Sequence, residues 1–114
     1  MFVASMVLAT MGAMCPAAGA DPASPGSHEF DIVVQHGKRI SGPAVLKVQQ
    51  GDDVVLQVTT DTADELHLHG YNLLVKLVPN RAGTLHFTAK LTGRFTYELH
   101  KSDLELGALE VYPR

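Results

Sequence analysis

The segment Asp53-Val54-Val55-Leu56-Gln57-Val58-Thr59-Thr60 decides the fold class of this chain. Its many β-branched residues are typical of a central β-strand. Similar short runs, separated by glycine, proline or asparagine, recur at residues 29–35, 38–40, 45–50, 71–78, 84–89, 94–100 and 107–112. No stretch shows the 3.6-residue apolar period of an amphipathic helix. We therefore predict an all-β sandwich or barrel of seven or eight strands.

The 114 residues are enough for one domain. Residues 1–20 are predicted to be a secretory signal peptide, because the apolar run Phe2–Met14 is followed by the small residues Ala18-Gly19-Ala20. That run is shorter than the roughly 20 apolar residues of a membrane-spanning helix. Residues 21–28 are predicted to form a flexible leader and residues 29–114 the domain. We expect a periplasmic or secreted protein with no membrane span after signal cleavage.

Sulfur is confined to the predicted signal peptide, which holds Cys15 and all four methionines. Residues 21–114 can therefore form no disulfide, and they can offer a metal only nitrogen and oxygen ligands. The formal net charge is −3, and the lysines and arginines are scattered along the chain. This charge pattern argues against a nucleic acid or an anionic membrane surface as partner.

The segment most suited to chemistry is Asp64-Glu65-Leu66-His67-Leu68-His69. Side chains two apart on a strand project from the same face, so His67 and His69 are predicted to lie together, opposite two core leucines. A third histidine, His100, closes the strand-like run at 94–100. Three imidazoles that converge in this way can bind a metal ion. The alternative is that these histidines are only the polar face of a sheet.

Other polar residues have simpler interpretations. His36 is predicted to lie in a tight turn with Gly37, and His86 on a solvent-facing side of its strand. Asp61 and Asp64 have two open interpretations. Each could accept hydrogen bonds from the backbone of a turn, or it could orient a metal-binding imidazole through the second ring nitrogen.

Four ordered motifs then resemble those of one known family. They are Val48-x-x-Gly51-Asp52, Asp64-x-x-His67, Gly93-Arg94-Phe95-Thr96-Tyr97 and Gly107-Ala108-Leu109-Glu110-Val111. In this order the motifs resemble a cupredoxin, and the histidine segment looks most like that of small exported cupredoxin-like proteins. The resemblance implies a Greek-key β-sandwich with a metal site at one end. In that site His67 would match the upstream histidine, and the other ligands would come from the last inter-strand loop.

The sequence departs from the blue-copper pattern of this family. Leu99 stands where the family places its cysteine ligand, and Glu105 stands where it usually places a methionine. His100 is adjacent to the cysteine position, although the family's histidine lies a few residues further on. A blue site needs a thiolate ligand. The sequence therefore excludes blue-copper electron transfer.

We expect a metal site of nitrogen and oxygen ligands, made by His67, His69 and His100 with Glu98 or Glu105. Such ligands suit Cu(II), and Zn(II) as a second choice. The expected role is that of a copper carrier, buffer or resistance accessory, with the metal ion and another envelope protein as candidate partners. The alternative is a metal-free module of the same fold that binds a partner protein. We expect no enzyme activity, because the sequence has no Ser-His-Asp arrangement and no phosphate-binding glycine loop.

Overall fold

The computed structural model describes Gly12 and residues 25–114. The predicted signal peptide, Gly12 apart, and residues 21–24 of the predicted leader lie outside the described residues. Within the described residues, no helix is long and apolar enough to cross a membrane.

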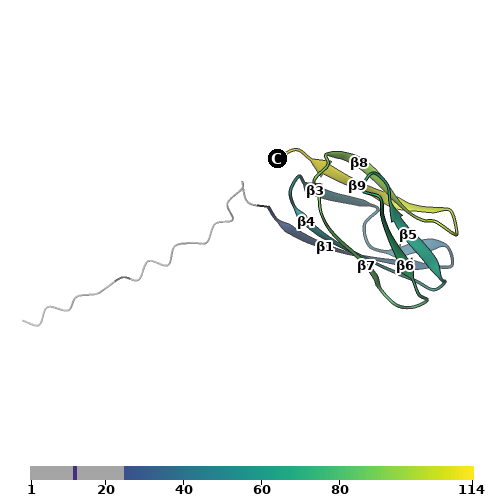
Figure 1. The fold of residues 1–114 in the computed structure, drawn as a ribbon. Coiled ribbons are helices and arrows are strands. Elements are labelled where there is room, and N and C mark those ends of the chain that lie inside the picture. Colours follow the sequence, from purple (N-terminus) through teal and green to yellow (C-terminus); the bar gives the residue numbers. More distant parts are fainter. Residues whose placement is uncertain (1–11, 13–24) are drawn as a thin grey trace, which may run out of the picture.

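Nine strands form two sheets that pack face to face (Figure 1). The strands are β1 (Ser27–Gln35), β2 (Lys38–Ser41), β3 (Val45–Gln49), β4 (Asp53–Thr60), β5 (Asp64–Leu68), β6 (Leu73–Leu77), β7 (Gly83–Thr88), β8 (Gly93–Leu99) and β9 (Leu104–Tyr112). The all-β prediction is confirmed. The described residues form nine strands where we predicted seven or eight, because the histidine segment forms an additional strand, β5, next to the predicted runs. The first strand also begins two residues before the predicted domain boundary.

The order of strands is β2-β1-β4-β7 in one sheet and β3-β9-β8-β5-β6 in the other. Most neighbouring strands are not consecutive in sequence, so the chain crosses repeatedly between the two sheets. Two of the pairs, β1 with β4 and β3 with β9, are parallel. The domain is therefore a cupredoxin-like β-sandwich, which confirms the fold class.

The core lies between the sheets and follows the alternation of the strands. Its largest fully buried side chains are Tyr97, Ile32, Leu46, Leu56, Leu66, Leu68, Leu99 and Leu109. The Tyr97 hydroxyl donates a hydrogen bond to the Pro43 carbonyl oxygen, 3.1 Å away. Nearby, Gly107 brings β9 so close to the loop between β2 and β3 that a Cβ atom there would lie 1.9 Å from the Ala44 carbonyl oxygen. Any side chain at this position would push the strand away from the loop.

The turn between β1 and β2 has the predicted form. His36 and Gly37 both have positive φ angles, 51° and 72°. Two such residues make the hairpin turn whose twist matches that of its strands. The backbone N–H of His36 also donates to Asp61 Oδ2 at 3.0 Å. Of the two roles predicted for Asp61, it therefore has that of accepting a hydrogen bond from the backbone of a turn.

A buried carboxylate just before β4, that of Asp52, joins three parts of the domain. The side chain of Asp52 is 3% exposed and accepts hydrogen bonds from the backbone N–H groups of Gly26 and Gln49 at 2.8 and 2.9 Å. It also lies 2.8 Å from His28 Nε2 and pairs with Arg114. These residues are far apart in the sequence, so no local pattern indicates the cluster.

The Asp52 cluster makes stability depend on pH. Burial raises the pKa of Asp52, but the hydrogen bonds from Gln49, Gly26 and His28 and the charge of Arg114 outweigh it and lower the pKa from 3.8 to about 2. A carboxylate whose pKa is lower in the folded state stabilises that state above its unfolded pKa, and this stabilisation is lost as pH falls.

We predict that the free energy of unfolding falls as pH decreases from about 5 to 1, with a loss of roughly 2.5 kcal/mol from Asp52 alone once the pH is below the folded pKa. Denaturant titrations at several pH values would measure it. Asp52→Asn should reduce this pH dependence while lowering stability near neutral pH. An equally steep acid dependence in the variant would contradict the assignment.

Candidate metal centre

Strand β5 separates its apolar and polar side chains cleanly. Leu66 and Leu68 are 0% and 1% exposed and belong to the core. Because alternate residues of a strand face opposite sides, the histidines between and after these leucines lie on the outer face of the five-stranded sheet. The predicted shared face of His67 and His69 is thus confirmed.

Strand β8 places an acidic residue beside the histidines. Leu66 pairs with Leu99, and both are buried, so the next pair in the register is His67 with Glu98. Residues directly opposite each other on antiparallel strands share a face. The backbone N–H of His69 continues the ladder by donating to the Thr96 carbonyl oxygen at 2.9 Å.

Three of the predicted ligands form one cluster. His67, His69 and Glu98 can each offer one ligand atom such that these atoms all lie within 4.8 Å of one another. His69 Nε2 is 2.7 Å from Glu98 Oε1, and His67 Nδ1 is 3.9 Å from the same oxygen. The two imidazole rings are 4.2 Å apart, centre to centre. The side chains of His67 and Glu98 are 21% and 22% exposed, and that of His69 is 47% exposed.

His100 lies at the edge of this cluster. Its ring centre is 6.4 Å from that of His67, and the two rings are nearly perpendicular. Its backbone N–H donates to the Glu65 carbonyl oxygen at 2.8 Å, one step beyond the end of β8. The third predicted histidine is therefore adjacent to the cluster, in the turn between β8 and β9.

The two positions that depart from the blue-copper pattern have different surroundings. Leu99 is 2% exposed and faces the core, so this position points away from the histidines. Glu105 on β9 pairs with Glu98 across the sheet, next to an irregularity in the register after Tyr97. It is exposed and shares the outer face with Glu98, but it is not one of the clustered residues.

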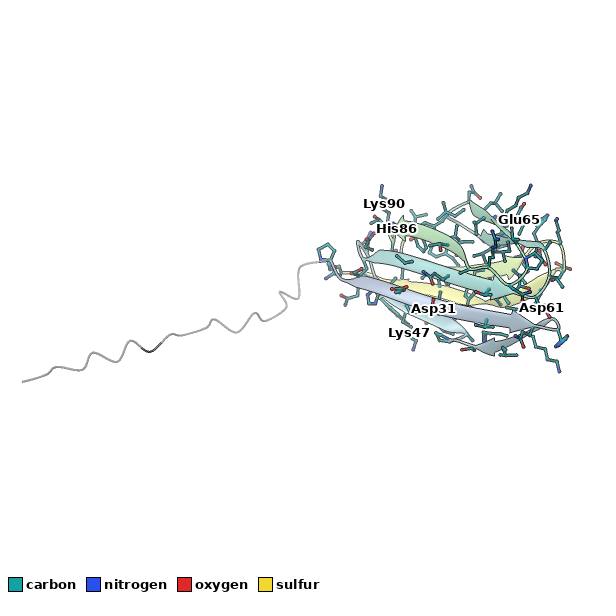
Figure 2. All side chains as sticks on the ribbon, turned by 90° about the horizontal axis from the view of Figure 1, so that it is seen from below. Asp31, Lys47, Asp61, Glu65, His86 and Lys90 are labelled. Atoms are coloured by element: carbon teal, nitrogen blue, oxygen red, sulfur yellow. The ribbon has the colours of Figure 1, made fainter. Side chains whose placement is uncertain are left out.

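The site lies on a face of the sandwich. The resemblance implied a site at one end, between loops, whereas β5 and the last part of β8 carry these side chains on the outside of the sheet, next to the β8–β9 turn. Figure 2 shows Glu65, which lies on β5 two residues before His67, and Asp61 toward one end of the domain, with His86 and Lys90 toward the other. A metal held here would keep an open side toward solvent.

Of the two roles predicted for Asp64, it has that of accepting hydrogen bonds from the backbone of a turn. It is 3% exposed, and its carboxylate accepts hydrogen bonds from the backbone of Glu65, Lys101 and Ser102. Burial raises the pKa of Asp64, but these hydrogen bonds and one from the Ser102 hydroxyl outweigh it, so the pKa is lowered. Its contacts are with the turn after His100 and not with an imidazole nitrogen.

The other described histidines lie away from the cluster: His36 is in the turn between β1 and β2, and the remaining two are on β7 and β1. His86 is exposed as predicted, and its Nε2 is 3.0 Å from Asp53 Oδ2. His28 belongs to the Asp52 cluster. Each has one carboxylate partner, so neither forms a comparable group of three ligands within the described part of the chain.

Comparison with solved structures agrees with the cupredoxin-like fold described above. No family model and no curated protein matches the sequence. Among solved structures, the metal-binding domain of the Cu(I)-exporting P-type ATPase CopA of Streptococcus pneumoniae D39, solved with Cu(I), has a TM-score of 0.64 at 17% identity, covering 77% of this chain and 88% of that one. A chain of a heme-copper terminal oxidase has a TM-score of 0.63 at 18% identity, covering 82% of this chain and 74% of that one.

A multi-copper oxidase from Pseudomonas thermotolerans has a TM-score of 0.61 at 21% identity, and the match covers 80% of this chain. The match spans about a third, 31%, of that oxidase. At these identities the similarity shows the fold alone. The matched structures and the two-sheet topology together identify residues 25–114 as a cupredoxin-fold domain, one that lacks the blue-copper cysteine.

Proposed function

We propose that this protein binds one copper(II) ion on the outer face of its five-stranded sheet and acts as a copper carrier, buffer or resistance accessory outside the cytoplasm. The observation that carries the proposal is the cluster of His67, His69 and Glu98, whose ligand atoms lie within 4.8 Å of one another. His100 is the candidate for a fourth ligand. The proposed role is binding, and neither blue-copper electron transfer nor catalysis.

The ligand chemistry supports copper(II). Two or three imidazoles with a carboxylate suit Cu(II), which also has the highest affinity in the divalent series, and Zn(II) is the next choice. Cu(I) favours thiolate and thioether ligands, and residues 21–114 contain neither cysteine nor methionine. Several matched proteins bind copper according to their descriptions, including the CopA domain solved with Cu(I). That likeness supports a copper role. The preference for Cu(II) over Cu(I) follows from this chain's own nitrogen and oxygen ligands.

The exposure of the site supports a role in storing or passing on the ion. His69 is nearly half exposed, and the cluster lies on an open sheet face. An incoming ligand from another protein can therefore approach the metal without any opening of the fold. The location outside the cytoplasm is supported by the signal peptide predicted at residues 1–20.

A second candidate function is a metal-free module that binds a partner protein. One observation favours it: His69 Nε2 already has a partner in Glu98 Oε1 at 2.7 Å, so the pair is satisfied without a metal. Leu74, which lies opposite His67 on β6, is 56% exposed and would give such a partner an apolar contact. Measurements with and without metal separate the two functions.

We predict that copper(II) raises the melting temperature of the purified domain. An ion at 100 times its dissociation constant stabilises the folded state by about 2.7 kcal/mol, which corresponds to a shift of roughly 10 °C or more for a domain of this size. Titration should give one ion per chain with a weak visible band, because no thiolate is present. Identical melting temperatures in copper, zinc and chelator would favour the metal-free module. A raised melting temperature with zinc alone would make zinc the bound metal in place of copper.

Substitution of single histidines should locate the site. His67→Ala and His100→Ala should each weaken copper binding by about ten-fold or more, because each removes an imidazole ligand. The matched control is His86→Ala, which removes an exposed histidine that also has one carboxylate partner but lies outside the cluster. Isothermal titration would measure the affinities. Equal losses in all three variants would indicate nonspecific binding to surface histidines.

Glu98→Gln tests whether the carboxylate of Glu98 binds the metal or stabilises the fold. The pair of His69 and Glu98 is partly exposed, and exposed ion pairs contribute about 0–1 kcal/mol, so the metal-free variant should lose less than about 1 kcal/mol of stability. Its copper affinity should fall. Leu66→Ala is the control for a structural role, with an expected loss of about 2–5 kcal/mol. A large stability loss with unchanged copper affinity would show that Glu98 serves the fold.

A further inference from the structure

The buried carboxylate of Asp64 is connected almost entirely to one turn. Its Oδ1 accepts hydrogen bonds from the backbone N–H groups of Glu65 at 2.7 Å and Lys101 at 2.8 Å. Its Oδ2 accepts from the N–H of Ser102 at 3.3 Å and from the Ser102 hydroxyl at 2.7 Å. Three of these four hydrogen bonds come from the turn between β8 and β9.

That turn has few other attachments. Its own backbone hydrogen bond, from the N–H of Asp103 to the His100 carbonyl oxygen, is long at 3.4 Å. Asp103 also adopts a positive φ of 52°, which is uncommon for a residue with a side chain. His100, Lys101 and Ser102 are all exposed, so side-chain burial does not hold the turn in place. Between the paired residues Leu99 and Leu104, the carboxylate of Asp64 therefore accepts most of the hydrogen bonds that attach the turn to the rest of the domain.

The anchored turn begins at His100. The β5–β8 ladder pairs Leu66, His67 and Leu68 with Leu99, Glu98 and Tyr97, and His100 follows directly. The N–H of His100 donates to the carbonyl oxygen of Glu65, which is the neighbour of Asp64. Strand pairing thus fixes the end of β8, and the Asp64 carboxylate holds the turn that follows, and with it the position of the His100 ring relative to that of His67.

We propose that Asp64 is a positioning residue that holds His100 beside His67, so that His100 can join His67, His69 and Glu98 around a metal ion. This inference rests on the proposed metal-binding function. Asp64 acts through the backbone of the turn, and none of its hydrogen bonds goes to a candidate ligand. A buried carboxylate is a costly way to fix a turn, since its burial must be offset by hydrogen bonds, and here four of them converge on it.

The domain contains its own control for this idea. Asp52 is also a buried carboxylate that accepts backbone hydrogen bonds, but its partners are Gly26, Gln49, His28 and Arg114. Asp64→Asn and Asp52→Asn should both lower the stability of the fold. Only Asp64→Asn should change the metal site.

The test is a double-mutant cycle on copper(II) affinity. Asp64→Asn should weaken copper binding by about ten-fold in the wild-type background, about as much as His100→Ala does, and by less than about two-fold when His100→Ala is already present. Asp52→Asn should change the affinity by less than about two-fold. If Asp64→Asn does not fold, Ser102→Ala, which removes one donor to the carboxylate, should show the same pattern with a smaller loss.

A second measurement does not need the metal. In the metal-free protein, ring protons of His67 and His100 should show a through-space NMR contact, and this contact should weaken in Asp64→Asn but persist in Asp52→Asn. Equal losses of copper affinity in Asp64→Asn and Asp52→Asn would overturn the inference. So would a ten-fold loss of copper affinity when Asp64→Asn is added to His100→Ala. If the wild type binds no metal, the proposed function fails, and an unchanged ring contact in Asp64→Asn would overturn the positioning role separately.

Discussion

The register between β5 and β8 is the constraint on which the candidate site depends. Leu66 and Leu99 pair directly and are almost fully buried, so each strand is fixed by core packing. Because strand side chains alternate, this one apolar pair requires His67 and Glu98 to lie side by side on the outer face. A shift by one residue would exchange leucines and histidines between core and solvent. Hydrophobic packing therefore positions His67 and Glu98, whereas His100 lies beyond the end of β8, in the turn that the hydrogen bonds of Asp64 hold.

Much of the fold could be predicted from the sequence because the signal is local. The alternation in segments such as 53–60 and 84–89 gives the strands, and the repeated turn residues separate them. The shared face of His67 and His69 follows from the period of a strand alone, and the missing cysteine at Leu99 excludes a blue-copper site. These conclusions need no knowledge of which strands are neighbours.

The remaining features depend on pairings between distant residues. The choice of Glu98 over Glu105 follows from the β5–β8 register and from the irregularity after Tyr97, and neither appears in a local pattern. The placement of the site on a face, and not at an end, has the same origin. The cluster of Asp52 with His28 and Arg114 includes a contact between residues 62 positions apart, so no local sequence pattern indicates it.

The parallel pairing of β3 with β9 has a consequence for how the domain acquires its structure. β3 ends at Gln49, and its only neighbour in the sheet, β9, begins at Leu104. Such distant contacts close long loops and slow folding. While the chain is being synthesised, β3 has no strand to pair with until nearly the whole domain has been made. The five-stranded sheet that carries the histidines is therefore completed only when its last-made strand, β9, takes its place between β3 and β8.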